Sequence, residues 1–163
     1  MTNNQTHIGI DCRDLFDPLV EPISFQNNPR DYIPETGSII YTVWDRDGQW
    51  IYVGIGGVGQ SPDTPLAKRN PRSRILQHRS GLRSGDQFCI YVHDYYIVPK
   101  LDLSTYKFRR GDLDKMTKDF IQKELFYRFM VFQTDNGNRL VRDLETVLKR
   151  GVPGVGKPLL NGV

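Results

Sequence analysis

The sequence has little cysteine and no long apolar run, and each scarcity excludes a class of protein. No stretch comes near the roughly 20 apolar residues that a membrane-spanning helix needs. The first residues lack the basic and then apolar pattern of a secretion signal. Cys12 and Cys89 are too few for a disulfide framework or a cysteine-rich zinc site, so we expect buried or free thiols. These absences predict a soluble cytoplasmic protein with no membrane association.

The net charge is also small, but it is unevenly distributed. The 163 residues suit one domain with a sizeable core, and 38% hydrophobic with 25% charged residues is an ordinary globular balance. The formal net charge is +3. Residues 1–37 hold two basic and six acidic residues, a net −4, whereas the rest hold 20 basic and 13 acidic residues, a net +7.

One stretch has no acidic residue. From Thr64 to Gly85 the charged side chains are all basic, namely Lys68, Arg69, Arg72, Arg74, Arg79 and Arg83. We call this the basic stretch. A block of one sign makes a positive surface that attracts phosphate, which predicts nucleic-acid contacts. A solvated face is the plain alternative, and charge alone leaves both interpretations open.

The first 37 residues show no clear hydrophobic period and contain four prolines. We expect them to form an irregular arm, 1–37, that packs on a domain formed by residues 38–163. Within that domain, Ser38–Trp44 is rich in β-branched and aromatic residues, and an Asp-Gly turn leads to a second such run, Trp50–Gly54. This pattern predicts a hairpin, and its period of two places Tyr41 on the same face as Ile39 and Val43.

The remaining chain alternates between helical and β-type patterns. We expect a helix from Asn70–Pro71 to near Gly81, a β-rich run over Gln87–Val98, a helix over Leu113–Phe126, a short strand over Phe129–Thr134 and a helix over Asn138–Arg150. This mixture predicts an α/β (α+β) fold.

Two glycine-rich patterns resemble nucleotide-binding motifs without their context. Gly54, Gly56 and Gly59 spell GxGxxG, but SPDTP follows where the helix of a dinucleotide-binding fold should begin. Residues 151–157 spell GxxxxGK, but Pro158 stands where a P-loop needs serine or threonine. We therefore interpret the first set as glycines that permit a tight loop or a close approach.

Five side chains can carry chemistry, although each also has a plain alternative. Tyr41 and Tyr52 lie on the hairpin, where tyrosines usually pack. Arg74 and His78 are four residues apart on one helix face, which is often a solvent face. Glu145 lies at the edge of the apolar stripe of the last helix, where surface ion pairs are common.

Their order along the chain is more informative than any one of them. The sequence IIYTV, a hairpin, YVGIGG, a helix with RILQH, then DLETVLKRG and PLLN resembles the GIY-YIG nuclease superfamily over about residues 37–162. IIY and YVG match the two name motifs, with Ile39 in place of the first glycine. The matching site residues are Tyr41, Tyr52, Arg74, His78, Glu145 and Asn161; Arg72 remains an alternative to Arg74.

The resemblance implies a fold and an activity. It implies a small, mainly antiparallel β-sheet with helices packed on it, enlarged by the N-terminal arm and by an insert at about 83–127, as in restriction-enzyme or stand-alone members. The implied activity is metal-dependent endonuclease cleavage of DNA. Glu145 would hold one Mg²⁺, or Mn²⁺ in its place, Arg74 would stabilise charge on the phosphate, and Tyr41 would act as base.

The other implied roles are supporting ones. His78 would assist Tyr41, because a free tyrosine has a pKa of about 10. Tyr52 would orient the water or phosphate, and Asn161 would fix the site by hydrogen bonds. The phosphate-tracking residues would be Lys68, Arg69, Arg72, Arg79 and Arg83.

Several alternatives stay open at this level. The chain could be a nucleic-acid-binding module of the same fold that does not cleave, or a nuclease for single-stranded DNA or RNA. A duplex cutter with one site per chain would favour a homodimer. A role in restriction or defence fits the resemblance. The sequence does not indicate which DNA sequence would be recognised.

Overall fold

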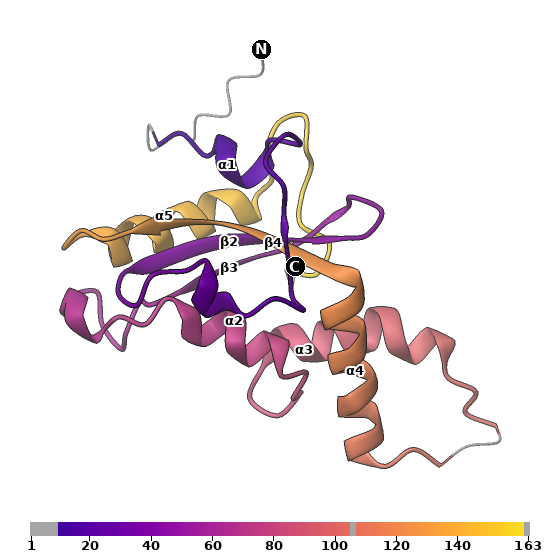
Figure 1. Cartoon of the computed structure of the whole chain (residues 1–163). Helices are drawn as coiled ribbons and strands as arrows, with labels where there is room; N and C mark the ends of the chain where they lie inside the picture. Colours follow the sequence, from indigo (N-terminus) through magenta and orange to yellow (C-terminus); the bar gives the residue numbers. More distant parts are fainter. Residues whose placement is uncertain (1–9, 105–106, 162–163) are drawn as a thin grey trace.

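The fold is built on a four-stranded sheet in which every pairing is antiparallel. The computed structural model describes residues 10–104 and 107–161. The strand order is β1-β4-β2-β3 (Figure 1), with β1 at Ile23–Ser24, β2 at Ser38–Asp45, β3 at Trp50–Gly56 and β4 at Leu125–Phe132. The α-helices are α1 (Arg13–Phe16), α2 (Arg72–Arg79), α3 (Gln87–Val92), α4 (Arg110–Glu124) and α5 (Gly137–Lys149). The prediction of an α+β fold with a mainly antiparallel sheet is confirmed.

The predicted hairpin is the centre of the sheet. β2 pairs with both β3 and β4, so it is covered on both edges, and residues 38–43 are all buried. Ile39 lies opposite Gly56, and Tyr41 lies opposite Gly54. The residues of β2 alternate between the two faces, so Ile39, Tyr41 and Val43 belong to one core.

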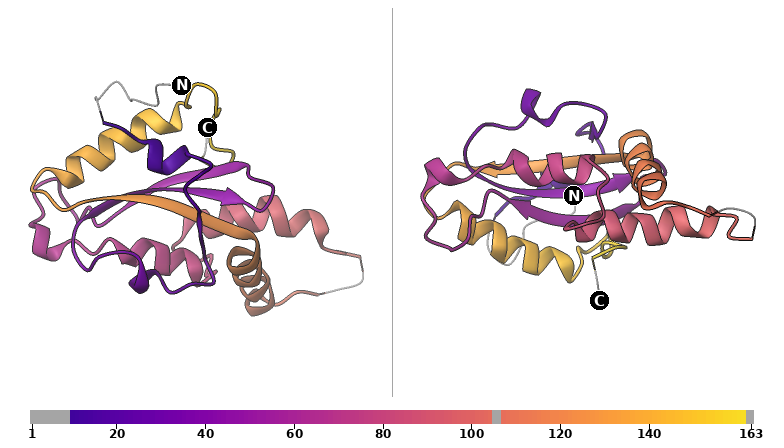
Figure 2. Two further views of the ribbon diagram at one scale, coloured as in Figure 1. Left: turned by 45° about the horizontal axis from the view of Figure 1, so that its top comes forward. Right: turned by 90° about the horizontal axis from the view of Figure 1, so that it is seen from below.

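Helices cover both faces of this sheet (Figures 1 and 2). On one face, α5 and α1 close an apolar core that includes Ile40, Leu144 and Phe16. On the other face, α2, α3 and α4 close a second core around Tyr41 and Phe88. The second core also takes in buried polar side chains, and the candidate site lies there.

The segment Gln87–Val98, predicted as a β-rich run, is helical. It forms α3, which continues as a π-helix over His93–Ile97 and a 3₁₀ turn over Val98–Lys100. The Asp86 side chain caps the start by accepting a hydrogen bond from the backbone N–H of Phe88 (3.1 Å). Burial of one helical face in the core outweighs the β-propensity of these residues, so the strand prediction was wrong.

The N-terminal arm is less irregular than predicted. Its strand β1 pairs with β4, and its single-turn helix α1 lies on the α5 side of the sheet. The arm contributes Leu15 to one core and Phe25 to the other. Residues 1–9 of the predicted arm and 162–163 of the predicted domain lie outside the described residues.

The other boundaries follow the sequence patterns closely. α2, α4 and α5 fall within three residues of their predicted limits, whereas β4 begins at Leu125, four residues before the predicted start. α3 and α4 both lie in the predicted insert, 83–127. Within the part of the chain that the structure describes, no helix is long and apolar enough to cross a membrane.

Candidate active site

Tyr41 and His78 meet across the interface between the sheet and α2. The Tyr41 hydroxyl and His78 Nε2 are 2.6 Å apart, and each residue is only 1% exposed. A Cβ on Gly54, directly across the sheet, would collide with the Tyr41 hydroxyl. Glycine at this position therefore makes room for the phenol, as expected for a close approach.

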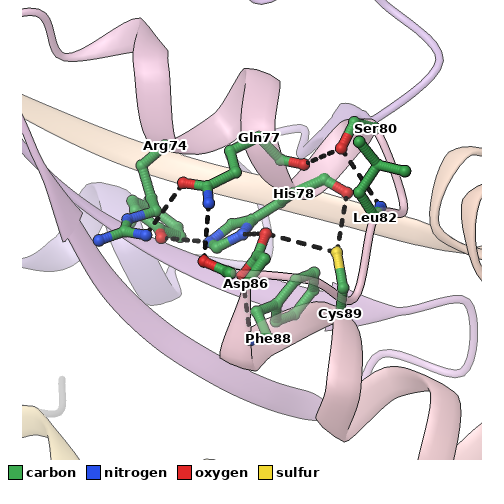
Figure 3. Close-up of polar contacts among 10 residues, drawn as sticks. Arg74, Gln77, His78, Ser80, Leu82, Asp86, Phe88 and Cys89 are labelled. Carbon is green, nitrogen blue, oxygen red and sulfur yellow. Dashed lines mark hydrogen bonds and ion pairs between the residues drawn. The ribbon is translucent and has the colours of Figure 1, made fainter.

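His78 has a second buried partner that the sequence did not reveal. Its Nδ1 lies 2.6 Å from Asp86 Oδ2, and Asp86 is 2% exposed (Figure 3). The thiol of Cys89 lies 3.4 Å from the same oxygen. The signal that could have identified Asp86 is its place one residue ahead of a helix start, but that helix was predicted as a strand.

The direction of these hydrogen bonds follows from the three pKa values. Burial raises the pKa of Tyr41 well above its usual value, so the phenol keeps its proton. Burial lowers the pKa of His78, which therefore stays neutral. Burial alone would raise the pKa of Asp86, but hydrogen bonds from His78, Cys89 and Phe88 outweigh it and lower the pKa. Tyr41 therefore donates to His78 Nε2, and His78 Nδ1 donates to the Asp86 carboxylate.

Tyr52 stands beside this chain of groups. Its ring centroid lies 6.4 Å from that of Tyr41 and 6.0 Å from that of His78, and it is the more exposed of the two phenols. Burial and then the negative charge of Glu145 raise the pKa of Tyr52 above its usual range. The predicted proximity of Tyr41, Tyr52 and His78 is present in the structure.

Arg74 lies on the exposed side of α2, four residues before His78. Its guanidinium donates to Gln77 Oε1 (3.0 Å), and the amide nitrogen of Gln77 donates to the carbonyl of Gly85 (2.9 Å). These two bonds connect Arg74 to the loop that precedes α3. The positive charge of Arg74 also lowers the pKa values of Tyr41 and His78.

Glu145 lies on α5, the helix that packs on the opposite face of the sheet from Tyr41. Its carboxylate pairs with Lys149 one turn later (3.1 Å), and its side chain is 20% exposed. Its charge acts on the pKa of both Tyr41 and Tyr52, so it lies within electrostatic reach of both hydroxyls. Its predicted place at the edge of the apolar stripe agrees with the burial of Leu144 and Leu148.

Glu145 is a hard oxygen donor, as Mg²⁺ or Mn²⁺ requires. The described residues contain no group of three or more His, Cys, Asp or Glu that could hold a metal ion. A single carboxylate fits an ion that keeps most of its waters, which is the habit of Mg²⁺. The partial exposure of Glu145 allows such a hydrated ion to approach.

Asn161 fixes strand β3 and not a substrate-facing group. Its Oδ1 accepts from the backbone N–H of Val53 (2.6 Å), and its Nδ2 donates to the carbonyl of the same residue (2.7 Å). Val53 lies between Tyr52 and Gly54 on the edge strand of the sheet. Asn161 therefore holds the strand that carries Tyr52 through the backbone of Val53.

The basic stretch is used differently from the prediction. Arg69 is 3% exposed, and its guanidinium donates to three backbone carbonyls, those of Thr64 (2.8 Å), Thr134 (2.8 Å) and Asp135 (2.7 Å). Arg69 is therefore a buried structural residue, and its predicted contact with nucleic acid was wrong.

Two further arginines hold the N-terminal arm. Arg72 donates to the carbonyl of Ile33 (2.6 Å), and Arg79 donates to those of Phe25 (2.8 Å) and Gln26 (2.9 Å). These guanidinium groups therefore face the arm and are not free to follow a phosphate backbone. Of the two alternatives for the catalytic arginine, Arg72 is therefore bonded to the arm, whereas Arg74 is exposed.

Arg83 also has an internal partner, since its Nε donates to Asp114 at 2.7 Å. Lys68 and Arg74 are exposed and both line a groove beside the candidate site. The lining of this groove includes Gly56 and Gly57, where an added Cβ would collide with neighbouring atoms. Of the predicted phosphate-tracking residues, Lys68 lines this groove, beside the predicted catalytic residue Arg74.

The loop that borders the groove is tied to the start of α5. Asn138 Nδ2 donates to the carbonyls of Ser61 and Pro62, and Arg139 pairs with Asp63 at 2.7 Å. Arg69 joins the same loop to the segment before α5 through its bonds to Thr64, Thr134 and Asp135. The groove wall and the helix that carries Glu145 are thus connected.

No protein family, curated protein or solved structure matches this chain.

Proposed function

We propose that this chain is a metal-dependent endonuclease that hydrolyses phosphodiester bonds in DNA, in keeping with its resemblance to GIY-YIG nucleases. The observation that carries the proposal is the buried hydrogen bond between Tyr41 and His78, beside Arg74 and within electrostatic reach of Glu145. The intact set of Tyr41, Tyr52, Arg74, His78 and Glu145 favours an enzyme over a binding module, because binding alone does not need all five.

Tyr41 is the proposed base, and His78 is its proton acceptor. The raised pKa of Tyr41 makes the isolated phenol reluctant to lose its proton near neutral pH. His78 Nε2, at 2.6 Å, can take that proton as Tyr41 takes one from the attacking water.

Arg74 and Tyr52 would bind the reacting phosphate group and the water. An arginine can pair with two phosphate oxygens and stabilise the charge that develops on them. The bond to Gln77 holds the guanidinium of Arg74 toward the groove. Tyr52, the more exposed phenol, would orient the water or phosphate through its hydroxyl.

Glu145 would hold the metal ion through its carboxylate. A bound Mg²⁺ or Mn²⁺ would supply Lewis-acid stabilisation of the phosphate and of the leaving oxygen. The lone carboxylate favours a single-metal mechanism over a two-metal one. Duplex cleavage with one site per chain would favour a homodimer, which is part of the proposal, as is a cytoplasmic role in restriction or defence.

The test compares Glu145→Ala with Asp143→Ala, an exposed carboxylate on the same helix. Each protein is incubated with duplex DNA, single-stranded DNA and RNA, in Mg²⁺ or EDTA, and the products are mapped. We expect Mg²⁺-dependent DNA fragments from the wild type and Asp143→Ala. Glu145→Ala should lose cleavage and keep DNA binding, because the metal ligand is removed without disturbing the groove.

Two outcomes would contradict the proposal. Mg²⁺-dependent cleavage retained by Glu145→Ala would exclude this residue as the metal ligand. Binding without cleavage of any nucleic acid by the wild type would make the chain a non-cleaving module of the same fold. Cleavage confined to single-stranded DNA or RNA would replace duplex DNA as the proposed substrate, while the proposed hydrolytic mechanism would stay unchanged.

A further inference from the structure

The least expected group in the core is Asp86. A carboxylate that is 2% exposed is costly to bury unless hydrogen bonds compensate for lost hydration. Three donors surround it: His78 Nδ1 at 2.6 Å, the thiol of Cys89 at 3.4 Å and the backbone N–H of Phe88 at 3.1 Å (Figure 3). These bonds keep Asp86 ionised inside the core.

Asp86 lies in the loop before α3, whereas its partner His78 lies on α2. Asp86 ends the loop between α2 and α3, and its backbone N–H donates to the carbonyl of Arg83. The bond from Gln77 to Gly85 holds the same loop against α2. The Asp86 carboxylate is therefore held at a fixed place relative to the His78 ring, and Phe88 packs on that ring with centroids 4.4 Å apart.

This arrangement decides which ring nitrogen of His78 carries the proton. An ionised carboxylate only accepts hydrogen bonds, so the Nδ1 that faces Asp86 must be the N–H. The neutral ring then has its lone pair on Nε2, and that nitrogen faces the Tyr41 hydroxyl. With the opposite tautomer, Nε2 could not accept the proton of Tyr41.

We infer that Asp86 is a positioning residue for the proposed cleavage, which holds His78 in the tautomer that accepts a proton from Tyr41. The inference rests on the proposed function and adds a residue to it. Asp86 contacts neither water nor phosphate and acts through His78. The negative charge of Asp86 also stabilises the imidazolium that forms when the proton arrives.

The proton and electron balance is that of a hydrolysis. The water oxygen uses an electron pair to form a bond to phosphorus, and its proton passes to Tyr41 as the proton of Tyr41 passes to His78 Nε2. The bond from phosphorus to the leaving oxygen breaks, and that oxygen takes a proton from solvent. His78 then returns its extra proton to water through Tyr41.

Asp86→Asn is the decisive variant because it keeps the shape of the side chain. Its amide oxygen can still cap α3 at Phe88, since asparagine is a good helix cap. Its amide nitrogen donates to His78 Nδ1, which moves the ring proton to Nε2 and blocks transfer from Tyr41. We expect kcat to fall by about 10²-fold or more, with KM for DNA unchanged.

A spectroscopic measurement separates positioning from a structural role. The ¹⁵N chemical shifts of the His78 ring report which nitrogen is protonated, and His78→Gln assigns the signals among the three histidines of the chain. In metal-free wild type we expect a protonated Nδ1 and an unprotonated Nε2. In Asp86→Asn we expect the reverse. Cys89→Ala, which removes another neighbour of Asp86, should keep the wild-type pattern.

The outcomes distinguish failure of the role of Asp86 from failure of the proposed function. A wild-type spectrum with protonated Nε2, or Asp86→Asn with wild-type kcat, would overturn the role of Asp86. The wild-type spectrum decides the tautomer even where Asp86→Asn does not fold. A wild type that cleaves no nucleic acid would overturn the proposed function, and the catalytic purpose of Asp86 with it, whereas the tautomer would still be measured.

Discussion

The arginines of the basic stretch fall into two groups, those whose side chains point into the molecule and one whose side chain is exposed. Arg69 and Arg79 turn into the molecule and donate to backbone carbonyls of other segments. Arg74, between them in sequence, is exposed and donates to a side chain, that of Gln77, at the border of the groove. The inward arginines bind the fold together, and the outward one is available to a ligand.

The difference has a physical origin in the segments that surround the stretch. Carbonyls of a sheet or helix find partners within it, but those of an irregular segment need donors from elsewhere. The arm and the loop before α5 expose such carbonyls at Phe25, Ile33 and Thr134, and arginines supply the donors. A run of basic residues can therefore donate hydrogen bonds to unpaired backbone carbonyls as well as bind phosphate.

Among variants of the basic stretch, the largest expected effect comes from Arg74→Ala. Removing the outward guanidinium should lower the cleavage rate by about 10²- to 10³-fold, because charge that develops on the phosphate loses its stabilising donor. The free energy of unfolding should change by less than about 0.5 kcal/mol, since the side chain is exposed. Single-turnover cleavage and urea unfolding measure the two quantities. A normal cleavage rate would show that Arg74 takes no part in catalysis. The proposed difference between the outward Arg74 and the inward arginines would then fail.

Arg69→Ala should give the opposite pattern. Three carbonyls lose a buried donor, and we expect the free energy of unfolding to fall by about 3 kcal/mol. Cleavage per folded molecule should persist at low temperature, because the guanidinium does not face the groove. Urea unfolding and cleavage at about 10 °C check this. Unchanged stability with lost cleavage would show that Arg69 acts at the site after all.

Lys68→Ala should have the smallest effect. Lys68 is exposed at the groove, so its loss should weaken DNA binding by a similar factor for all sequences and lower the salt slope of binding by about one. Lys115→Ala, on the exposed face of α4, is the matched control. Fluorescence anisotropy over a range of salt concentrations measures both. Equal salt slopes of DNA binding for the two variants would show that Lys68 does not contact the DNA phosphates.

The sequence was sufficient to predict those site residues whose positions follow the periodicity of a single strand or helix. Alternation placed Tyr41 on the correct face of β2, and a spacing of four placed Arg74 and His78 on one side of α2. Asp86 was missed because the following segment is rich in β-forming residues, and its helical state is set by burial in the core. The burial of Arg69 was missed because charge in a sequence does not reveal which carbonyls lack partners.

The loop beside the groove has a consequence for how a ligand would enter and leave. Its glycines suggest a segment that moves, yet Asn138, Arg139 and Arg69 hold it to the start of α5. A groove with walls already in place costs little ordering entropy on association. Exchange of DNA would then be governed by displacement of counterions from its phosphates, with no loop closure to wait for.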